Sequence, residues 1–398
     1  MFTPTLQRRE IAILVGGAFI SALSWLAMIP WNIHGWMIGA PLGRDFVNFW
    51  MAPRLVLAGQ GALLVDQPAY SAAIKTAFQM TRDPLLIFVY PPHSLLLFAP
   101  FAALPFLPAV LLWTAANLAA LALTTRLLLR GSPVWGPILV VCLSPPAVAM
   151  MMYGHFGGLL ALATTVALIE AGRRPWLAGL CLAVLSMKPQ FACAIGLILL
   201  LSGHWRCLAV GALATLALVA ASVGMFGIEV WQRFVTITMP VQSAFITQFD
   251  AKMIETSVTA YFAARYSGLP AGAAWILQGV VSAACLAFAV AAMRRDVREP
   301  GALAVIILGA LVMQPYVSHY DLAIAAPALA LLVLGRAPGA APMTVAAWLL
   351  LPMARILIVF DLPILGVLVP GALFAQAMRL FRPQELALPR NRALDVAA

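Results

Sequence analysis

The sequence has little charge. Only 10% of its 398 residues are Asp, Glu, Lys or Arg, whereas 63% are hydrophobic. Soluble domains carry about 25% charged residues, so this composition excludes a water-soluble globular protein. Lysine supplies only three of the 24 basic residues. The arginines are scattered in ones and twos between apolar runs, so the net charge of +10 forms no nucleic-acid-binding patch, and we expect no nucleic-acid partner.

Recognisable metal-ligand patterns are also missing. No two aspartates stand two positions apart, which removes a simple acidic metal motif. The five cysteines fall inside apolar runs, and their spacing fits neither a zinc site nor a disulfide framework. We expect them to be small core residues, and the sequence predicts no cofactor, while a divalent-metal requirement stays open. The five are Cys142, Cys181, Cys193, Cys207 and Cys285.

What the chain has in abundance is long apolar runs. A spanning helix needs about 20 apolar residues, and in lipid the backbone must satisfy its own hydrogen bonds. The sequence therefore predicts an all-α polytopic membrane protein, one integral membrane domain with about 12 transmembrane helices. The expected parts are an uncleaved first span at 11–31, a first outer loop at 32–92, membrane helices at 93–226, a second outer loop at 227–270, membrane helices at 271–379 and a cytoplasmic tail at 380–398.

The distribution of charge predicts the orientation. With both termini on the inner side, 15 of the 24 basic residues fall inside and 8 of the 14 acidic residues fall outside. This asymmetry follows the positive-inside rule, which the reversed topology would break. The inner basic groups are Arg8, Arg9, Arg126, Arg130, Arg173, Arg174, Arg206, Arg294, Arg295, Arg298, Arg336, Arg379, Arg382, Arg390 and Arg392.

Two regions are less regular. The first outer loop contains two amphipathic pieces, "FVNFWMAPRLVLAG" and "DQPAYSAAIKTAFQM", which are too short and too polar to span; helices lying in the membrane interface suit them. Between 94 and 130 the motif "LPFLP" interrupts an apolar stretch, which is therefore either two short spans or a re-entrant piece plus one full span. Pro145 and Pro146 raise the same question for the next stretch.

The remaining polar residues gather on the expected outer side. They come from distant parts of the chain, and ionisable residues near a membrane are functional candidates because they are costly there. A carboxylate beside cations suits transfer from a phosphate leaving group: the carboxylate takes a proton from the attacking hydroxyl, and the cations stabilise the departing phosphate. The candidates are Arg44, Asp45, Tyr90, His93, His155, Lys188, Gln190, Gln314, His319 and Tyr320.

Each candidate also has a structural interpretation. Arg44 and Asp45 are compatible with a solvated interfacial pair, and Lys188 with a side chain that snorkels from a helix end. His93 and His155 are compatible with structural hydrogen bonding. In "QPYVSHYD", Ser318 or Asp321 can cap the following helix, and we expect Asp321 to do so. Asp361 is expected to be a cap or an interfacial charge.

Four stretches together resemble the membrane-embedded GT-C glycosyltransferases, and within them glycosyltransferase family 87. They are "RDFVNFWMAPRLVLAGQGALLVDQPAY", "FVYPPHSLLLFAPFAALP", "YGHFGGLLALATTVALIEAGRRPWLAGLCLAVLSMKPQ" and "QPYVSHYDL". The resemblance implies a GT-C type bundle whose members move a sugar from a polyprenyl-phosphate carrier to a lipid or glycan acceptor, inverting the anomeric carbon. It implies Asp45 as the base, with His319 and Lys188 at the donor phosphate, and we expect Arg44 either to keep Asp45 ionised or to contact that phosphate. The implied substrate groove comprises Tyr90, His93, His155, Gln190, Gln314 and Tyr320; family members often have Gln where this chain has His155.

The resemblance also implies a location and partners. We expect an integral protein of the bacterial inner membrane, with the active site on the periplasmic side and with membrane lipids around it. Mannose is the default sugar of the family, and arabinofuranose or another hexose stays open, as does the acceptor. A secondary transporter or lipid-carrier flippase is the alternative, since it predicts broken helices of the kind that the prolines mark.

Overall fold

The computed structural model describes residues 11–12, 15–23, 43, 45–80, 86–129, 135–247, 257–334 and 365–381. Every element named within these ranges is a helix, and the one extended pairing there is an isolated bridge between Ser257 and Ser318. The expected all-α fold is therefore confirmed for the described residues. The end of the first span, residues 335–364 within the expected membrane helices and the tail from residue 382 lie outside them.

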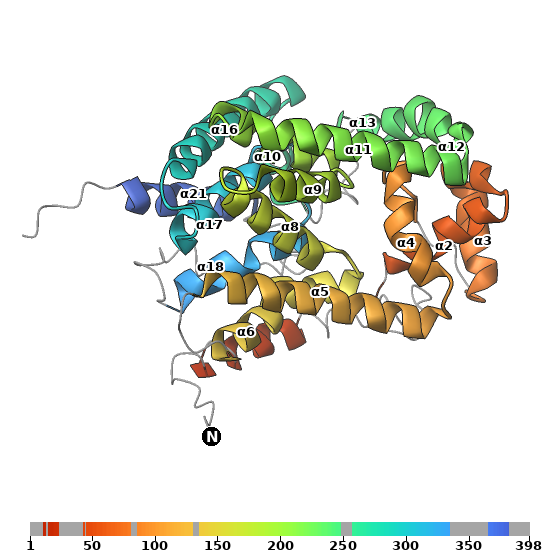
Figure 1. Cartoon of the computed structure of the whole chain (residues 1–398), viewed down its shortest axis with the longest axis horizontal. Helices are drawn as coiled ribbons and strands as arrows, with labels where there is room; N and C mark the ends of the chain where they lie inside the picture. Colours follow the sequence, from red (N-terminus) through yellow and green to blue (C-terminus); the bar gives the residue numbers. More distant parts are fainter. Residues whose placement is uncertain are drawn as a thin grey trace, which may run out of the picture.

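In the described part of the chain, three helices are long and apolar enough to cross a membrane alone. A fourth span results if two consecutive helices, bent by 48° relative to each other, count as one span. Figure 1 shows α5 and α11 both running lengthwise, with α8 and α9 between them. The long helices are α5 (Phe106–Leu128), α11 (Trp205–Phe226) and α16 (Ala271–Met293), and the bent pair is α6 (Trp135–Cys142) with α7 (Pro145–Tyr153).

The other apolar helices are shorter than a full span. Prolines begin α9, α10 and α17, where the missing N–H costs nothing and the fixed φ favours the first turn. Because about 20 residues are needed to cross the hydrocarbon core, the count of about 12 spans stays a prediction. These helices are α8 (Gly157–Glu170), α9 (Pro175–Leu185), α10 (Pro189–Leu201), α17 (Pro300–Val312), η5 (His319–Ala325), α18 (Ala326–Val333) and α21 (Leu365–Phe381).

The two amphipathic pieces expected in the first loop are both helical. They form α2 (Phe46–Leu57) and α3 (Gln67–Ala77), joined by the short helix η2 (Gly61–Val65). Asp66 caps α3 by accepting a hydrogen bond from the backbone N–H of Ala69 at 3.1 Å. Most side chains of α2 are buried, so this helix packs into the protein body. Its location at the membrane interface stays a prediction.

The "LPFLP" motif separates a short helix from a full-length one. The chain turns through η3 (Pro92–Ser94) into α4 (Leu95–Ala102) and then breaks before α5. The break leaves carbonyl groups without helical partners, and side chains of α2 bind them. Arg54 donates to the carbonyls of Ala102 and Leu104 at 2.7 and 3.1 Å, and Trp50 donates to Leu104 at 2.9 Å. Protein contacts thus satisfy the broken backbone, which favours a short piece plus one full-length helix.

The expected second outer loop, residues 227–270, packs against the first outer loop and the helix that follows it. It comprises α12 (Ile228–Arg233), η4 (Phe234–Thr238), α13 (Met239–Thr247) and α15 (Ala260–Tyr266). Trp231 stacks on His93, and the side chain of Gln242 donates to the carbonyl of Val89. Figure 1 accordingly shows α12 at the same end of the molecule as α2, α3 and α4.

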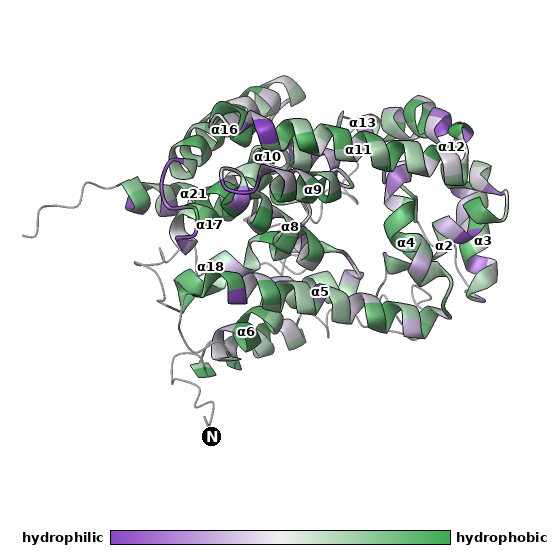
Figure 2. Cartoon of the chain, in the orientation of Figure 1, coloured by the Kyte–Doolittle hydropathy of each residue, from purple (hydrophilic) through white to green (hydrophobic). Residues whose placement is uncertain are grey.

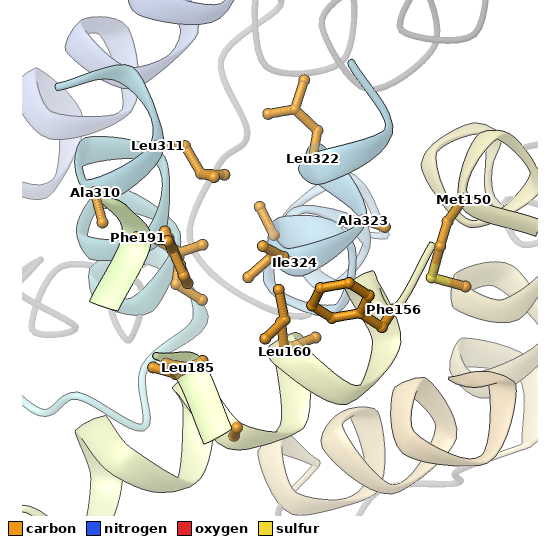
Figure 3. Packing of buried hydrophobic residues seen from close by; sticks show 14 of the residues in the cluster. Met150, Phe156, Leu160, Leu185, Phe191, Ala310, Leu311, Leu322, Ala323 and Ile324 are labelled. Carbon is orange, nitrogen blue, oxygen red and sulfur yellow. The ribbon is translucent and has the colours of Figure 1, made fainter. Parts of the chain in front are cut away.

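The buried core between α8 and η5 supports the residues described below. Figure 3 shows Phe156 and Leu160 of the α8 segment facing Ala323 and Ile324 of η5, all of them buried. On another face, α8 approaches α5 very closely. A Cβ atom on Gly158 would lie 2.2 Å from the carbonyl oxygen of Asn117, so only glycine fits there. This contact fixes the start of α8 against α5.

Polar and basic turns lie at opposite ends of α8, α9, α10 and α17. The sequence places residues 154–156, 186–188 and 313–321 at one end of these helices and the arginine-containing turns at the other. At the second end, Arg298 pairs with Glu170 at 3.2 Å. Figure 2 shows the helices mainly in the hydrophobic colour and the connection 294–299, between α16 and α17, in the hydrophilic one.

Candidate active site

Two glycines bring the start of α2 against the end of α7. Gly154 ends α7 in the left-handed conformation, with φ 74°. A Cβ there would lie 2.7 Å from the Cα of Gly43, so the missing side chain is what permits the approach. The backbone N–H of Gly43 then donates to Met152 at 3.1 Å, and that of Asp45 donates to Tyr153 at 2.8 Å. Residue 45 is therefore fixed through the backbone next to the 153–155 turn.

The close contact between Gly43 and Gly154 places Asp45 in a hydrogen-bonded series of side chains with His155 and Tyr90. The Nε2 of His155 pairs with Oδ2 of Asp45 at 3.0 Å, and its Nδ1 pairs with the hydroxyl of Tyr90 at 3.3 Å. Tyr320 stacks on the imidazole with ring centres 3.8 Å apart and planes 14° from parallel. The side chain of His155 is 4% exposed, whereas that of Asp45 is 17% exposed. The carboxylate is thus the more accessible member of the pair.

The surroundings shift the pKa values of His155 and Tyr90. Burial lowers the pKa of His155 below its usual 6.5, and the hydrogen bond that His155 makes to Asp45 opposes that shift without overcoming it. Burial, followed by the charges of Asp321 and Asp45, raises the pKa of Tyr90 well above 10. At neutral pH the imidazole is therefore uncharged and the phenol keeps its proton.

An ion pair lies beside the hydrogen-bonded pair of His155 and Asp45. Lys188, which precedes α10, pairs with Oδ1 of Asp321; their side chains are 8% and 11% exposed. The other oxygen of Asp321 accepts from the backbone N–H of Ser318 at 3.3 Å, completing a capping box on η5. The ammonium group of Lys188 also lies over the rings of Phe156 and Tyr320, at 5.5 and 5.4 Å. The expected cap by Asp321 is confirmed, and its pairing with Lys188 is an additional contact.

The backbone before η5 is held by polar residues of two other helices. Thr259, the cap of α15, donates to the carbonyl of Pro315 at 3.0 Å, and Ser282 of α16 donates to that of Met313 at 2.7 Å. The sequence interpretation did not identify these two residues. The sequence could have indicated them, because a hydroxyl side chain beside or inside an apolar run needs a hydrogen-bond partner.

Three predicted groove residues have contacts apart from Asp45. His93 pairs with the hydroxyl of Ser186 at 2.9 Å and stacks on Trp231, which is the structural role left open by the sequence. Gln314 donates to a carbonyl of its own helix α17 at 2.6 Å. Gln190, in the first turn of α10, is exposed. A role for these three in binding substrate stays a prediction.

The last two candidates are described in part or not at all. Arg44 lies outside the described residues, and so does the side chain of His319, whose backbone begins η5. Both are nonetheless chain neighbours of the cluster, since Asp45 follows Arg44 and Tyr320 follows His319. Among the described residues, no group of three or more His, Cys, Asp or Glu side chains is placed to hold a metal ion.

The structure therefore brings together residues from five separate segments: Asp45, Tyr90, His155, Lys188 and the 320–321 pair. A carboxylate and a cation occur side by side there, bordered by aromatic rings. Such a site is equipped to accept a proton and to stabilise an anion.

Comparison with known proteins gives one finding. A family model, described as glycosyltransferase family 87, matches residues 88–318 of the chain, which is more than half of its 398 residues. The match includes Tyr90, His155 and Lys188 and does not extend to Asp45 or Asp321. No curated protein and no solved structure matches the chain.

Proposed function

Because the chain belongs to glycosyltransferase family 87, we propose that it is a membrane enzyme that uses a polyprenyl-phosphate sugar as its donor. Membership of the family makes it a glycosyltransferase with a sugar donor and an acceptor, and its apolar helices make it an integral membrane protein. The proposed donor sugar is mannose and the proposed acceptor is a lipid-linked or other glycan. Transfer inverts the configuration of the anomeric carbon.

Asp45 is the proposed general base. The observation that carries this assignment is its pairing with neutral His155 at 3.0 Å, because the carboxylate is fixed by a hydrogen bond and partly exposed to a substrate. A base must lie within hydrogen-bonding reach of the hydroxyl that it deprotonates, and a fully buried carboxylate would be protonated. Asp45 meets the second requirement, because its side chain is 17% exposed, and that exposure leaves it open to an acceptor hydroxyl.

The charge of the cluster indicates how the donor phosphate is bound. Lys188 is the one cation among its described members, and it already faces Asp321. A phosphate therefore needs further positive charge, for which we propose Arg44 and His319, with Lys188 shared between Asp321 and the phosphate. Charge-assisted hydrogen bonds to phosphate are about twice as strong as neutral ones, so these cations would also stabilise the departing group.

The remaining candidates are proposed to line the substrate groove. His155 contacts Asp45, and Tyr90 and Tyr320 contact His155. His93, Gln190 and Gln314 are proposed for the outer parts of the same groove. Aromatic rings beside hydrogen-bonding groups suit a sugar, which has apolar faces and polar edges.

The proposed site faces the periplasm of a bacterial inner membrane, and both termini face the cytoplasm. The support is the separation of polar and basic turns at opposite ends of α8, α9, α10 and α17, because basic turns are retained on the cytoplasmic side. The alternative, a transporter or flippase, rested on the broken helices. In α6–α7 the break is capped locally, since Ser144 accepts from Ala147 at 3.3 Å, and the family membership favours glycosyl transfer.

The test is a transfer assay in membranes that contain the full chain, with radiolabelled polyprenyl-phosphate mannose and identification of the labelled product. We expect Asp45→Asn to lower the rate by about 10²- to 10⁴-fold, the usual contribution of a general base. Glu229→Gln is the matched control, because it neutralises an exposed carboxylate on α12. Full activity of the Asp45→Asn variant would remove Asp45 as the base, and transfer from a nucleotide sugar alone would remove the proposed donor.

A further inference from the structure

His155 is enclosed by groups that fix both its plane and its hydrogen bonds. Its two ring nitrogens pair with Asp45 and Tyr90 at 3.0 and 3.3 Å. One face stacks on Tyr320 at 3.8 Å, and the edge of the ring meets Phe49 at 5.7 Å and 85°. The side chain is 4% exposed. An imidazole held in this way has no freedom to rotate, so its direction toward the carboxylate is set by the fold.

The chemistry of the three groups fixes the direction of each hydrogen bond. An ionised carboxylate only accepts, so the Nε2 of His155 must carry a hydrogen and donate it to Asp45. In a neutral imidazole the other nitrogen then only accepts, so the hydroxyl of Tyr90 must donate to Nδ1. Burial raises the pKa of Tyr90 well above 10, which keeps that donor protonated.

We propose that His155 is a positioning residue that holds the carboxylate of Asp45 in the orientation needed for proton abstraction, with Tyr90 selecting its tautomer. The inference rests on the proposed function. In the transfer step, the acceptor O–H bond breaks and its proton goes to Asp45. The acceptor oxygen bonds to the anomeric carbon, and the bond from that carbon to the phosphate oxygen breaks, leaving its electron pair on the polyprenyl phosphate. His155 neither gains nor loses a proton in this step.

The charges around the imidazole keep it neutral. Asp45 and Asp321 both raise the pKa of His155, and Lys188 lowers it. Burial is the largest influence and also lowers the pKa, so the neutral ring prevails. The neutral phenols of Tyr90 and Tyr320 complete its surroundings. A neutral donor stabilises the carboxylate without neutralising it, which preserves its ability to take the acceptor proton.

The test compares two substitutions of His155 in the full-length enzyme in membranes. In His155→Gln the amide N–H still reaches toward Asp45 but cannot titrate, whereas His155→Leu removes the donor. We expect His155→Leu to lower kcat by about 10²-fold and to change the donor KM much less than that, because the buried ring orients Asp45 and offers little surface to the donor. We expect His155→Gln to retain kcat to within about tenfold and to lose activity at a lower pH than the parent, since only the carboxylate then titrates.

His204→Leu is the control, because this histidine lies between α10 and α11, at the other end of α10 from Lys188. Unchanged kcat in His155→Leu, with Asp45→Asn inactive, overturns the positioning role and leaves the proposed function intact. An active Asp45→Asn variant overturns the proposed function itself. If the leucine variant does not fold, the pH profile of the glutamine variant decides the matter. Loss of activity at the same acidic pH as the parent overturns the proposal, and loss at a lower pH than the parent supports it.

Discussion

The approach of Gly43 to Gly154 controls the position of Asp45, and Gly154→Ala tests it. The new Cβ would lie 2.7 Å from the Cα of Gly43 and 2.7 Å from the Cβ of Phe46. Carbon atoms normally pack at about 3.5–4.0 Å, so the 43–46 backbone must move away by about 1 Å. That displacement lengthens the 3.0 Å bond between Asp45 and His155 beyond hydrogen-bonding range.

We expect this variant to lose about 10²-fold in transfer rate, because a misplacement of about 1 Å at a reacting group has an effect of that size. The substitution also places alanine in the left-handed conformation, which costs about 1–2 kcal/mol in stability. Gly203→Ala separates the two effects. Its φ is 83°, and nothing lies within 4 Å of its added Cβ, so it carries the backbone strain without the displacement.

The assay measures initial transfer rates in membranes and thermal unfolding in detergent for both variants. Gly203→Ala should show the loss of stability and keep the parental rate, whereas Gly154→Ala should show both losses. Equal rates in the two variants would refute the argument that the glycine pair positions Asp45.

Three further predictions concern neighbouring parts of the site. Lys188→Met leaves the buried carboxylate of Asp321 without its cation, so we expect a thermal midpoint lower by several degrees and a higher donor KM; Asp321→Asn in the same chain should restore much of the stability. Because burial lowers the pKa of His155, the unfolded chain takes up this proton first on acidification, so stability measured by thermal unfolding should fall as the pH drops below about 6.5. Gly158→Ala would place a Cβ 2.2 Å from the carbonyl oxygen of Asn117, so we expect a lower melting temperature and a poorer yield of folded protein.

The sequence predicted helices best where an apolar run has clear boundaries. The membrane helices expected from residue 271 begin there with α16, because Pro270 marks its start and Arg294 its end. The membrane helices expected to end at residue 226 also do so, since α11 ends at Phe226. The broken regions were left open because a proline does not reveal which groups bind the freed carbonyls. That answer required Arg54 and Trp50, which reach the break from a different helix.

The site was predicted as a set of residue types and not as a set of pairs. Asp45, His155 and Lys188 were all candidates, but the partnership of His155 with Asp45 joins residues 110 positions apart, and that of Lys188 with Asp321 joins residues 133 positions apart. Contacts over such separations depend on packing that one sequence does not reveal. His93 illustrates the same limit, because its residue type fitted a groove and its contacts are with Ser186 and Trp231.

The short length of α8 bears on the depth of the proposed active site in the bilayer. Its 14 residues rise about 21 Å at 1.5 Å each, whereas the hydrocarbon core of a bilayer is about 30 Å thick. A helix of that length, with its basic end at one membrane surface, stops well below the opposite headgroups. With that placement, His155 and its neighbours at the other end of α8 would lie below the level of the opposite headgroups. The proposed polyprenyl-phosphate donor would then present its phosphate to the enzyme while its tail stays in the hydrocarbon core.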